Sequence, residues 1–383
     1  MILRSISTIL LFLFLFPVFT NGQFDSTEHS LGKKVVQYAY RFVNDSMDVA
    51  KPKFLLYPVL AYSPETNLEI GFSGLYLYYA KGKYEKNRLS EIQGFTFFTL
   101  NRQYGAWFDH FIYTDDDDWF FLGRLRFHRF PIWYYGVGPN TLKENQTVLN
   151  SDYTLIKERI LRKVRKDFFI GVEVDYQRLY NVSFGRKVGT GYLAGADGTS
   201  NLGLGLGLVY DNRKNALNVR NGFFAEVGYL WYRPQWGSEY TFNSLISDFR
   251  IFRTVRPKQV LAWQLSAVGM GGQVPFNQLA QMGGESLMRG YYMGRFRDRT
   301  FAATQLEYRW LPFPGCKRLG GVLFAGFGTV GPTWEELLQQ RILPTAGVGL
   351  RYLIFPRKDI FIRFDVGLTP EGPGFYIYTG EAF

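Results

Sequence analysis

Arg289 and Glu307 are the two residues whose types and spacing best define a site in this sequence. Arg289 lies in a glycine-rich stretch that has the composition of a loop. A guanidinium keeps its charge and presents five N–H donors, so a buried arginine needs a carboxylate within reach. Glu307, on the strand predicted to follow, is the candidate partner. The expected loop motif consists of Gly283, Gly284, Met288, Arg289, Gly290 and Tyr291.

The strand that carries Glu307 is predicted by strict alternation in residues 301–310. Apolar or aromatic residues such as Leu306 and Tyr308 fall on one face, and Gln305, Glu307 and Arg309 fall on the other. One face of this strand is therefore apolar, and the other is polar and solvated. The expected chemistry is an ion pair that pins a loop to a strand.

Catalytic and metal-binding alternatives have little support. His29 lies in the polar N-terminal segment outside the predicted barrel. His110 and His128 have no serine close in sequence, and the chain contains no G-x-S-x-G motif. The acidic run 115–118 has consecutive carboxylates, whereas calcium loops space their ligands alternately, so a solvated turn is expected there. We expect no enzymatic activity, no metal site and no cofactor, and a hydrolase is the weakest alternative function.

Alternating segments recur throughout residues 54–383 and predict about sixteen strands of membrane-crossing length. In residues 202–210, leucines alternate with glycines, so leucine can face lipid while glycine leaves room in a lumen. A soluble sandwich also alternates, but charged residues at mid-strand and aromatic residues near strand ends favour a transmembrane barrel. The predicted strands are 54–64, 68–80, 90–103, 104–115, 119–131, 151–166, 167–184, 202–215, 220–233, 240–255, 259–272, 300–312, 317–332, 343–356, 359–370 and 372–383.

The predicted fold is therefore all-β, a closed antiparallel transmembrane barrel. A sheet in lipid cannot leave an edge, so the first strand is expected to pair with the last. Pro58 lies inside the first strand and cannot donate to a ladder, which marks an edge or weakly paired strand. The last strand is expected to have Phe375 and Ile377 at apolar positions and to continue to Phe383. Weak closure is expected at this seam.

The N-terminus resembles a secretory signal: Arg4 is followed by an apolar core and by small residues before position 23. The expected domains are a signal peptide (1–22), a short periplasmic segment (23–53) and an outer-membrane barrel (54–383). The formal net charge of +11 does not indicate nucleic-acid binding, because no basic segment carries the aromatic side chains on which the bases of a single strand would stack. Anionic lipopolysaccharide is the better expected partner, and the candidate residues are Lys81, Lys83, Lys86 and Arg88.

The Met288–Tyr291 element, the strand segment 305–309 and the C-terminal sequence FYIYTGEAF together resemble the barrel domain of the BamA/TamA superfamily, the bacterial surface antigen family. The resemblance covers residues 54–383. In that family a (V/L)RG(F/Y) tip on the sixth extracellular loop folds back into the barrel lumen, which implies the same for the loop around Arg289. The family arginine also meets an aspartate in an F-x-D-x-G strand, but the matching position here is Gly326. Asp298 and Asp365 remain as alternatives for the second acid.

The resemblance also implies a location and a role. Segment 23–53 is too short for a POTRA repeat, so a barrel-only member of the family is expected in a Gram-negative outer membrane, after Sec-type export. Such a barrel would assist insertion or rearrangement of outer-membrane proteins or lipids through a weak first/last-strand seam. Its expected partners are outer-membrane lipids, the barrel assembly machinery for its own insertion, and an unfolded protein or lipid substrate. A passive transport or secretion pore is the alternative.

Overall fold

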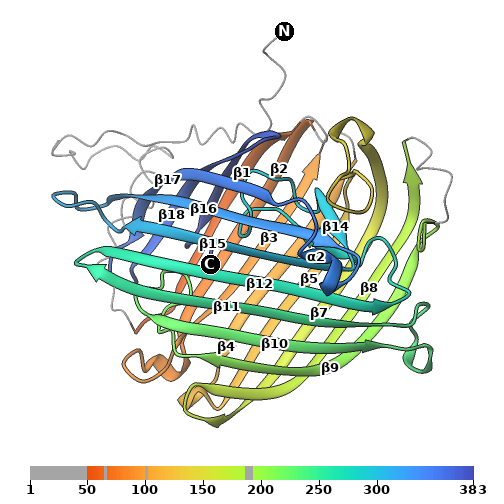
Figure 1. The fold of residues 1–383 in the computed structure, drawn as a ribbon. Coiled ribbons are helices and arrows are strands. Elements are labelled where there is room, and N and C mark those ends of the chain that lie inside the picture. The colour runs from red at the N-terminus through yellow and green to blue at the C-terminus, as the bar shows by residue number, and fades with distance from the viewer. Residues whose placement is uncertain (1–49, 64–66, 100–101, 186–192) are drawn as a thin grey trace.

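The computed structural model describes residues 50–63, 67–99, 102–185 and 193–383. The predicted signal peptide, His29 and most of the predicted periplasmic segment lie outside these ranges. The described chain forms one antiparallel sheet of seventeen strands that is rolled into a barrel (Figure 1). The prediction of an all-β antiparallel barrel is confirmed. No helix in the described ranges is long and apolar enough to span a membrane.

The barrel strands follow one another around the sheet in chain order. They are β1 (Lys53–Ser63), β2 (Asn67–Tyr79), β3 (Leu89–Thr99), β4 (Tyr104–Tyr113), β5 (Trp119–Arg129), β7 (Thr147–Arg165), β8 (Phe168–Phe184), β9 (Thr199–Asp211), β10 (Gly222–Tyr232), β11 (Phe242–Arg256), β12 (Gln259–Gly272), β15 (Thr300–Trp310), β16 (Leu319–Gly331), β17 (Leu343–Phe355), β18 (Ile360–Thr369) and β19 (Gly372–Thr379). The short β6 (Ile132–Tyr134) follows β5 in the chain and pairs with the first residues of β7, beyond the end of the ladder between β5 and β7.

The connections differ at the two ends of the barrel. At one end, which we call the loop end, lie the long connections 130–146, 233–241, 273–299 and 332–342. They contain η3 (Lys143–Asn145), η4 (Pro234–Trp236), α2 (Trp334–Leu337) and the two-stranded sheet of β13 (Ala280–Met282) and β14 (Phe296–Asp298). At the other end, the turn end, the connections include η1 (Ala80–Gly82) and η2 (Asp115–Asp117). The two longest connections of the described chain, 130–146 and 273–299, both lie at the loop end.

Alternation separates the two faces of the sheet as the sequence predicts. On β9, Leu204, Leu206 and Leu208 are exposed on the outer face. A Cβ added at the intervening Gly207 would lie 3.0 Å from the side chain of Arg159, which points into the lumen. Leucine therefore forms the lipid-facing surface of this strand, and glycine makes room for a charged side chain inside.

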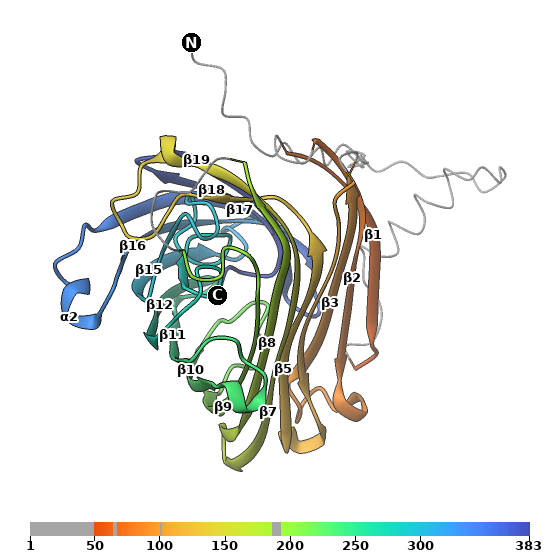
Figure 2. The same cartoon turned by 90° about the vertical axis from the view of Figure 1, so that its right-hand side faces the viewer.

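The barrel has one seam, between β1 and β19. Ladders join β1 to β2 and each later strand to its neighbour as far as β18 and β19, but none of the described ladders joins β19 back to β1. The first and last strands lie apart at this point (Figure 2). The described ladders therefore do not include the expected pairing of the first strand with the last. Pro58 does lie in an edge strand, where its missing N–H breaks no outer ladder.

Side chains bridge the seam at the turn end. Leu75 and Leu77 of β2 belong to the same buried apolar cluster as Phe355 and Ile360, which flank the turn between β17 and β18. Lys358 in that turn places its Nζ 4.9 Å from the centre of the Tyr79 ring. The seam is therefore held by packing and a cation–π contact at one end, without backbone hydrogen bonds between its two edge strands.

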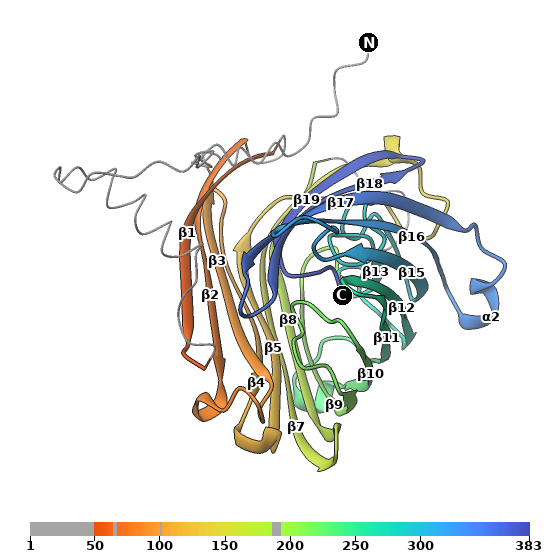
Figure 3. The ribbon, with the colours of Figure 1, turned by 90° about the vertical axis from the view of Figure 1, so that its left-hand side faces the viewer.

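The C-terminal residues do not continue the last strand. β19 ends at Thr379, and the chain then turns into the barrel, where the C-terminus lies inside the rolled sheet (Figure 3). Phe383 is buried against Val219 and Phe252. The prediction of a strand extending to residue 383 is wrong, because Glu381 finds buried arginine partners in the lumen that a lipid-facing strand could not offer.

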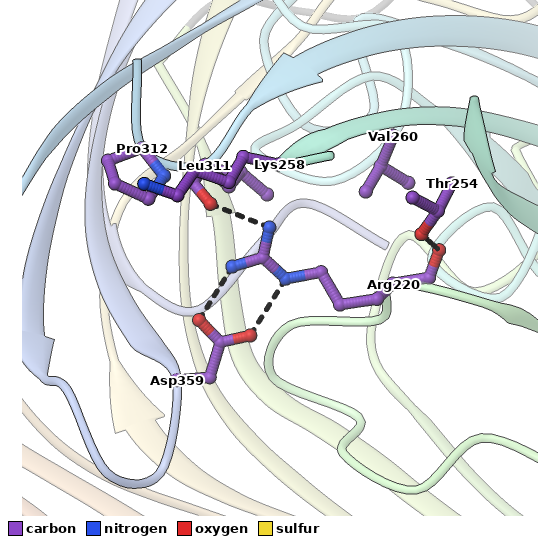
Figure 4. Close-up of a pocket in the computed structure, with 7 residues that line it drawn as sticks. All are labelled: Arg220, Thr254, Lys258, Val260, Leu311, Pro312 and Asp359. Atoms are coloured by element: carbon purple, nitrogen blue, oxygen red, sulfur yellow. Dashed lines mark hydrogen bonds and ion pairs between the residues drawn. The ribbon is translucent and has the colours of Figure 1, made fainter. Parts of the chain in front are cut away.

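The connection between β9 and β10, residues 212–221, reaches the turn between β17 and β18. Arg220 makes a bidentate ion pair with Asp359, with distances of 2.7 Å from Nε and 2.6 Å from Nη2, and its Nη1 donates to the Leu311 carbonyl at 2.7 Å (Figure 4). These residues line a cavity of about 380 Å³ at the turn end. Because Arg220 already donates to protein from all three nitrogens, the cavity offers no free guanidinium to a ligand.

The basic connection after β2 pairs with the acidic run after β4. Lys81 and Lys83 lie 2.8 Å and 2.9 Å from the carboxylate of Asp115. These hydrogen bonds hold the pKa of the Asp115 carboxyl below its usual range. The expected solvated turn is present, but its charges are balanced by the lysines that were candidates for lipopolysaccharide contact.

Candidate functional site

Arg289 is inserted into the lumen and contacts two acids on two strands. Its guanidinium pairs with Glu307 of β15, and its Nη1 lies 2.6 Å from Oδ2 of Asp365 on β18. All three side chains are fully excluded from solvent. The guanidinium also stacks 3.6 Å from the centre of the Phe324 ring on β16. We call this set of contacts the loop anchor.

Asp365 is the shared acid of a larger lumen network. Besides Arg289, it accepts from Arg351 Nη1 at 2.5 Å and from Arg363 Nη1 at 2.8 Å. Arg363 also donates to the backbone carbonyl of Glu285 at 3.0 Å, which ties the start of the loop to β18. A carboxylate can accept several charge-assisted hydrogen bonds, and three buried cations would repel one another without it.

The C-terminal segment joins the same network. Glu381 accepts from Arg351 Nε at 2.8 Å and lies 3.8 Å from Arg309 Nε. Arg309 also pairs with Glu307 at 2.7 Å and donates to the Phe383 carbonyl at 3.1 Å. Loop, strands and C-terminal residues are therefore connected by one continuous chain of buried ion pairs.

Glycine allows the loop tip to lie directly on the backbone of β18. Gly290 has a φ of +108°, in the left-handed region that glycine tolerates best. A Cβ added at Gly367 would lie 2.5 Å from the carbonyl of Arg289, so any side chain there would push the tip away. The Gly290 N–H donates to the Tyr376 hydroxyl of β19 at 2.9 Å, and the Tyr291 hydroxyl donates to the Pro344 carbonyl at 3.0 Å.

The rest of the predicted motif supports this tip. Met288 is fully buried in an apolar cluster with Met282, Ala303 and Val330. Gly283 and Gly284 have φ values of +115° and +116°, and a Cβ at Gly283 would lie 2.3 Å from a backbone oxygen of the same loop. The structure therefore brings all six motif residues and Glu307 into one folded loop and its contacts.

At the loop end, a second arginine of the same loop is fixed by other connections. Arg295 pairs with Glu371, which lies between β18 and β19, at 2.6 Å and 2.7 Å. It also donates to the hydroxyl and carbonyl of Thr141 at 2.8 Å and 2.7 Å. The loop is thus held at its tip by the loop anchor and at its base by Arg295.

Of the two alternatives for the second acid, the structure places only Asp365 against Arg289. Asp298 lies in β14 and accepts from the backbone N–H of Arg299 at 2.7 Å. The contributions of Arg309, Arg351, Arg363 and Glu381 were not predicted. The alternation of the last strands placed Arg351 and Arg363 on the polar face, but it could not show that they converge on one acid.

The two histidines of the described chain are not among the contacts of the loop anchor. His128 Nδ1 accepts from Trp107 at 3.3 Å, and His110 pairs with Glu158. Within the described ranges no group of three or more His, Cys, Asp or Glu residues is arranged to hold a metal ion. Pro58, Phe375 and Ile377 lie in the two strands that border the seam.

A model of the Omp85 superfamily domain matches residues 99–366. The chain belongs to the Omp85 superfamily. The match extends from β3 to β18 and includes the loop, Glu307 and Asp365 of the loop anchor. No match is found among curated protein sequences.

Solved structures show the same fold at low sequence identity. This Omp85 chain is similar to BamA from Haemophilus ducreyi lacking POTRA domains 1–3, with a TM-score of 0.53 and 13% identity over 86% of this chain and 69% of that chain. It is also similar to CdiB from Escherichia coli, with a TM-score of 0.55 and 10% identity over 86% of this chain and 61% of that one. CdiB from Acinetobacter baumannii has a TM-score of 0.50 and 10% identity over 85% and 59% of the two chains.

The chain thus spans less than two thirds of either CdiB chain. The solved structures show that the fold of this chain is similar to these barrels, and the family match gives its superfamily.

Proposed function

We propose that this Omp85 barrel resides in the outer membrane and assists the insertion or rearrangement of outer-membrane proteins or lipids at the seam between β1 and β19. The observation that carries this proposal is the absence of a described ladder between these two edge strands. Unpaired N–H and C=O groups at a strand edge are a template for pairing with another strand. In a bilayer such an edge is costly unless it is satisfied, so it favours an incoming strand.

The loop anchor supports a defined role for the loop. The anchor joins β15 and β18, and the pair of Arg351 with Glu381 adds the C-terminal segment, so the last strands are held in one position relative to the lumen. In our proposal the loop end faces the exterior and the turn end faces the periplasm. The anchored loop fills the lumen beside the seam, so that a substrate enters the membrane laterally at the seam and does not pass through the lumen. Substrates would be unfolded outer-membrane proteins or lipids.

The test is insertion of an unfolded barrel protein into liposomes that contain the purified barrel. The expected result is faster insertion with the wild-type barrel than with empty liposomes, and loss of the acceleration in Arg289→Ala. Arg124→Ala is the matched control, because it removes an arginine of β5 whose side chain is 59% exposed and pairs with Asp109 on β4, outside the loop. Wild-type liposomes that give no acceleration, with a correctly folded barrel, would overturn the proposal.

A pore is the second candidate, and the charged lumen wall favours it. Arg159 pairs with Glu173 of β8 and Glu226 of β10, each at 2.7 Å, so this wall of the lumen is strongly polar. A pore predicts steady conductance in planar bilayers, whereas a loop-filled barrel predicts low conductance that rises when Arg289→Ala frees the loop.

A further inference from the structure

His110 and Glu158 form a polar pair on the outer face of the barrel. His110 lies on β4 and Glu158 on β7, and His110 Nε2 is 3.1 Å from Oε2 of Glu158. Both side chains are partly accessible, at 19% and 27%. The function proposed above makes no use of this pair.

Glycine on the intervening strand makes this contact possible. In the sheet register, Gly123 of β5 stands between His110 and Glu158. A Cβ added there would lie 2.2 Å from His110 Cε1 and 2.3 Å from Glu158 Oε2. The two side chains therefore meet above β5 only because position 123 has no side chain.

The pair lies on the lipid-facing surface. Glu158 alternates with Lys157 and Arg159, whose partners Glu173 and Asp175 are buried on the inner side. The neighbouring residues of its own face, Ile156 on β7 and Phe108 on β4, are exposed apolar side chains.

The height of the pair on the barrel places it within the apolar belt. Trp119 is exposed at the turn end of β5, and Arg162 stacks 5.7 Å from its ring, as expected at a membrane interface. Gly123 lies further along the strand, about 13 Å from Trp119 at a rise of about 3.3 Å per residue. Ionisable groups at such a depth are costly and usually mark a functional contact.

Lipid acyl chains offer no hydrogen-bond donor or acceptor to His110 and Glu158. His110 Nδ1 has no hydrogen-bond partner within the described ranges, although Nε2 is engaged with Glu158. A protonated imidazole donates from both nitrogens, and a carboxylate accepts several hydrogen bonds. The site is thus incomplete in one copy of the chain, and what is missing is a hydrogen-bond partner for His110 Nδ1.

We propose that a second copy of this chain completes the site. A two-fold axis along the membrane normal, passing close to Gly123, places His110 of each copy opposite Glu158 of the other copy. Each His110 Nδ1 then meets the Glu158 carboxyl group of the other copy, so the four polar side chains satisfy one another. Such an interface is self-complementary, as two-fold dimers require. It also leaves β1 and β19 free, so the dimer and the seam can operate together.

The experiment measures energy transfer between labelled copies in liposomes. Cys316 is the only cysteine of the chain and is exposed at the turn end, so it carries either the donor or the acceptor dye. Wild-type barrels are expected to show transfer that falls as lipid dilutes the protein. His110→Phe and Glu158→Leu should each weaken dimerisation by about three- to twentyfold, the range of interhelical hydrogen bonds in membranes. Leu206→Ala, on the lipid face of β9, should leave dimerisation unchanged.

Mixing the two variants separates contact between copies from a role inside one barrel. A Glu158→Leu copy keeps His110, and a His110→Phe copy keeps Glu158, so a mixed dimer restores one of the two contacts. Transfer between the two variants should exceed transfer within either one. Equal transfer in all three combinations, absence of transfer in the wild type, or a monomer that retains an ethanolamine phospholipid in native mass spectrometry would overturn the second-copy proposal. Heat-modifiable mobility on gels confirms that each variant is folded.

Discussion

Arg289 and Asp365 are 76 residues apart in the chain, yet their side chains meet at 2.6 Å with no access to solvent. This contact fixes the tip of a loop between β12 and β15 to the strand before the last one. Because Asp365 also binds Arg351 and Arg363, the loop position is coupled to the inward side chains of β17 and β18. The seam is bordered by β19, which pairs directly with β18.

Replacing Arg289 tests the loop anchor. Arg289→Ala leaves Glu307 and Asp365 with one cation fewer in a buried site, which should cost about 3–5 kcal/mol of unfolding free energy. Arg289→Lys should cost less, because an ammonium keeps the charge but cannot reach both acids with a planar fork. Urea unfolding in lipid vesicles, followed by tryptophan fluorescence, measures both. Equal stability of wild type and Arg289→Ala would contradict the anchor.

Neutralising Asp365 tests the acid that the lumen network shares. Asp365→Asn removes the acceptor charge that three arginines share, and about 3–5 kcal/mol is expected from the unpaired buried cations. Asp118→Asn is the control, since the Asp118 side chain is 68% exposed and lies 3.8 Å from Lys163. Exposed pairs contribute about 0–1 kcal/mol. The same urea titration distinguishes the two, and a control as damaging as Asp365→Asn would argue against the network.

A methyl group at Gly367 should displace the loop tip without changing any charge. Its Cβ would lie 2.5 Å from the Arg289 carbonyl, so Gly367→Ala should destabilise the barrel by about 1–3 kcal/mol, as overpacking does. Gly271→Ala is matched to it, because a Cβ at Gly271 meets nothing within 4 Å. Limited proteolysis reads the displacement: cleavage within residues 283–291 should appear only in Gly367→Ala.

The paired connections at the turn end should depend on pH in one direction. Contacts with Lys81 and Lys83 depress the pKa of Asp115, so the contacts stabilise the folded state above the ordinary aspartate pKa of about 3.9. That contribution is lost as the pH falls below this value and the carboxylate is protonated. Protection of the amides of residues 80–88 from hydrogen exchange, taken relative to the intrinsic rate at each pH, should therefore fall below about pH 4 and stay constant between about pH 5 and 7. Lower protection at neutral pH than at about pH 4 would contradict this.

The strands were predictable because alternation is a local signal. Leu204, Leu206 and Leu208 fall on the lipid face as their spacing requires, and Glu307 falls on the inner face for the same reason. The partner of Arg289 was only partly predictable. A family pattern pointed to position 326, which is glycine, whereas the acid is supplied by Asp365, two strands further along the sheet.

The C-terminal residues were not predictable from alternation. Phe375 and Ile377 continue the strand pattern, and nothing local shows that the chain leaves the sheet after Thr379. The chain turns inward because Arg351 and Arg309 in the lumen pair with the carboxylate of Glu381. Such long-range ion pairs have no signature in the spacing of neighbouring residues.

The most direct test of the seam is hydrogen exchange of the barrel in lipid nanodiscs, resolved along the strands. Each edge strand has a ladder on one side only, so alternate amides of β1 and β19 should exchange rapidly. Amides in the interior pair β7 and β8 should be protected throughout. Protection of β1 and β19 equal to that of β7 and β8 would mean that a ladder closes the barrel, and would contradict the account of a seam open to an incoming strand.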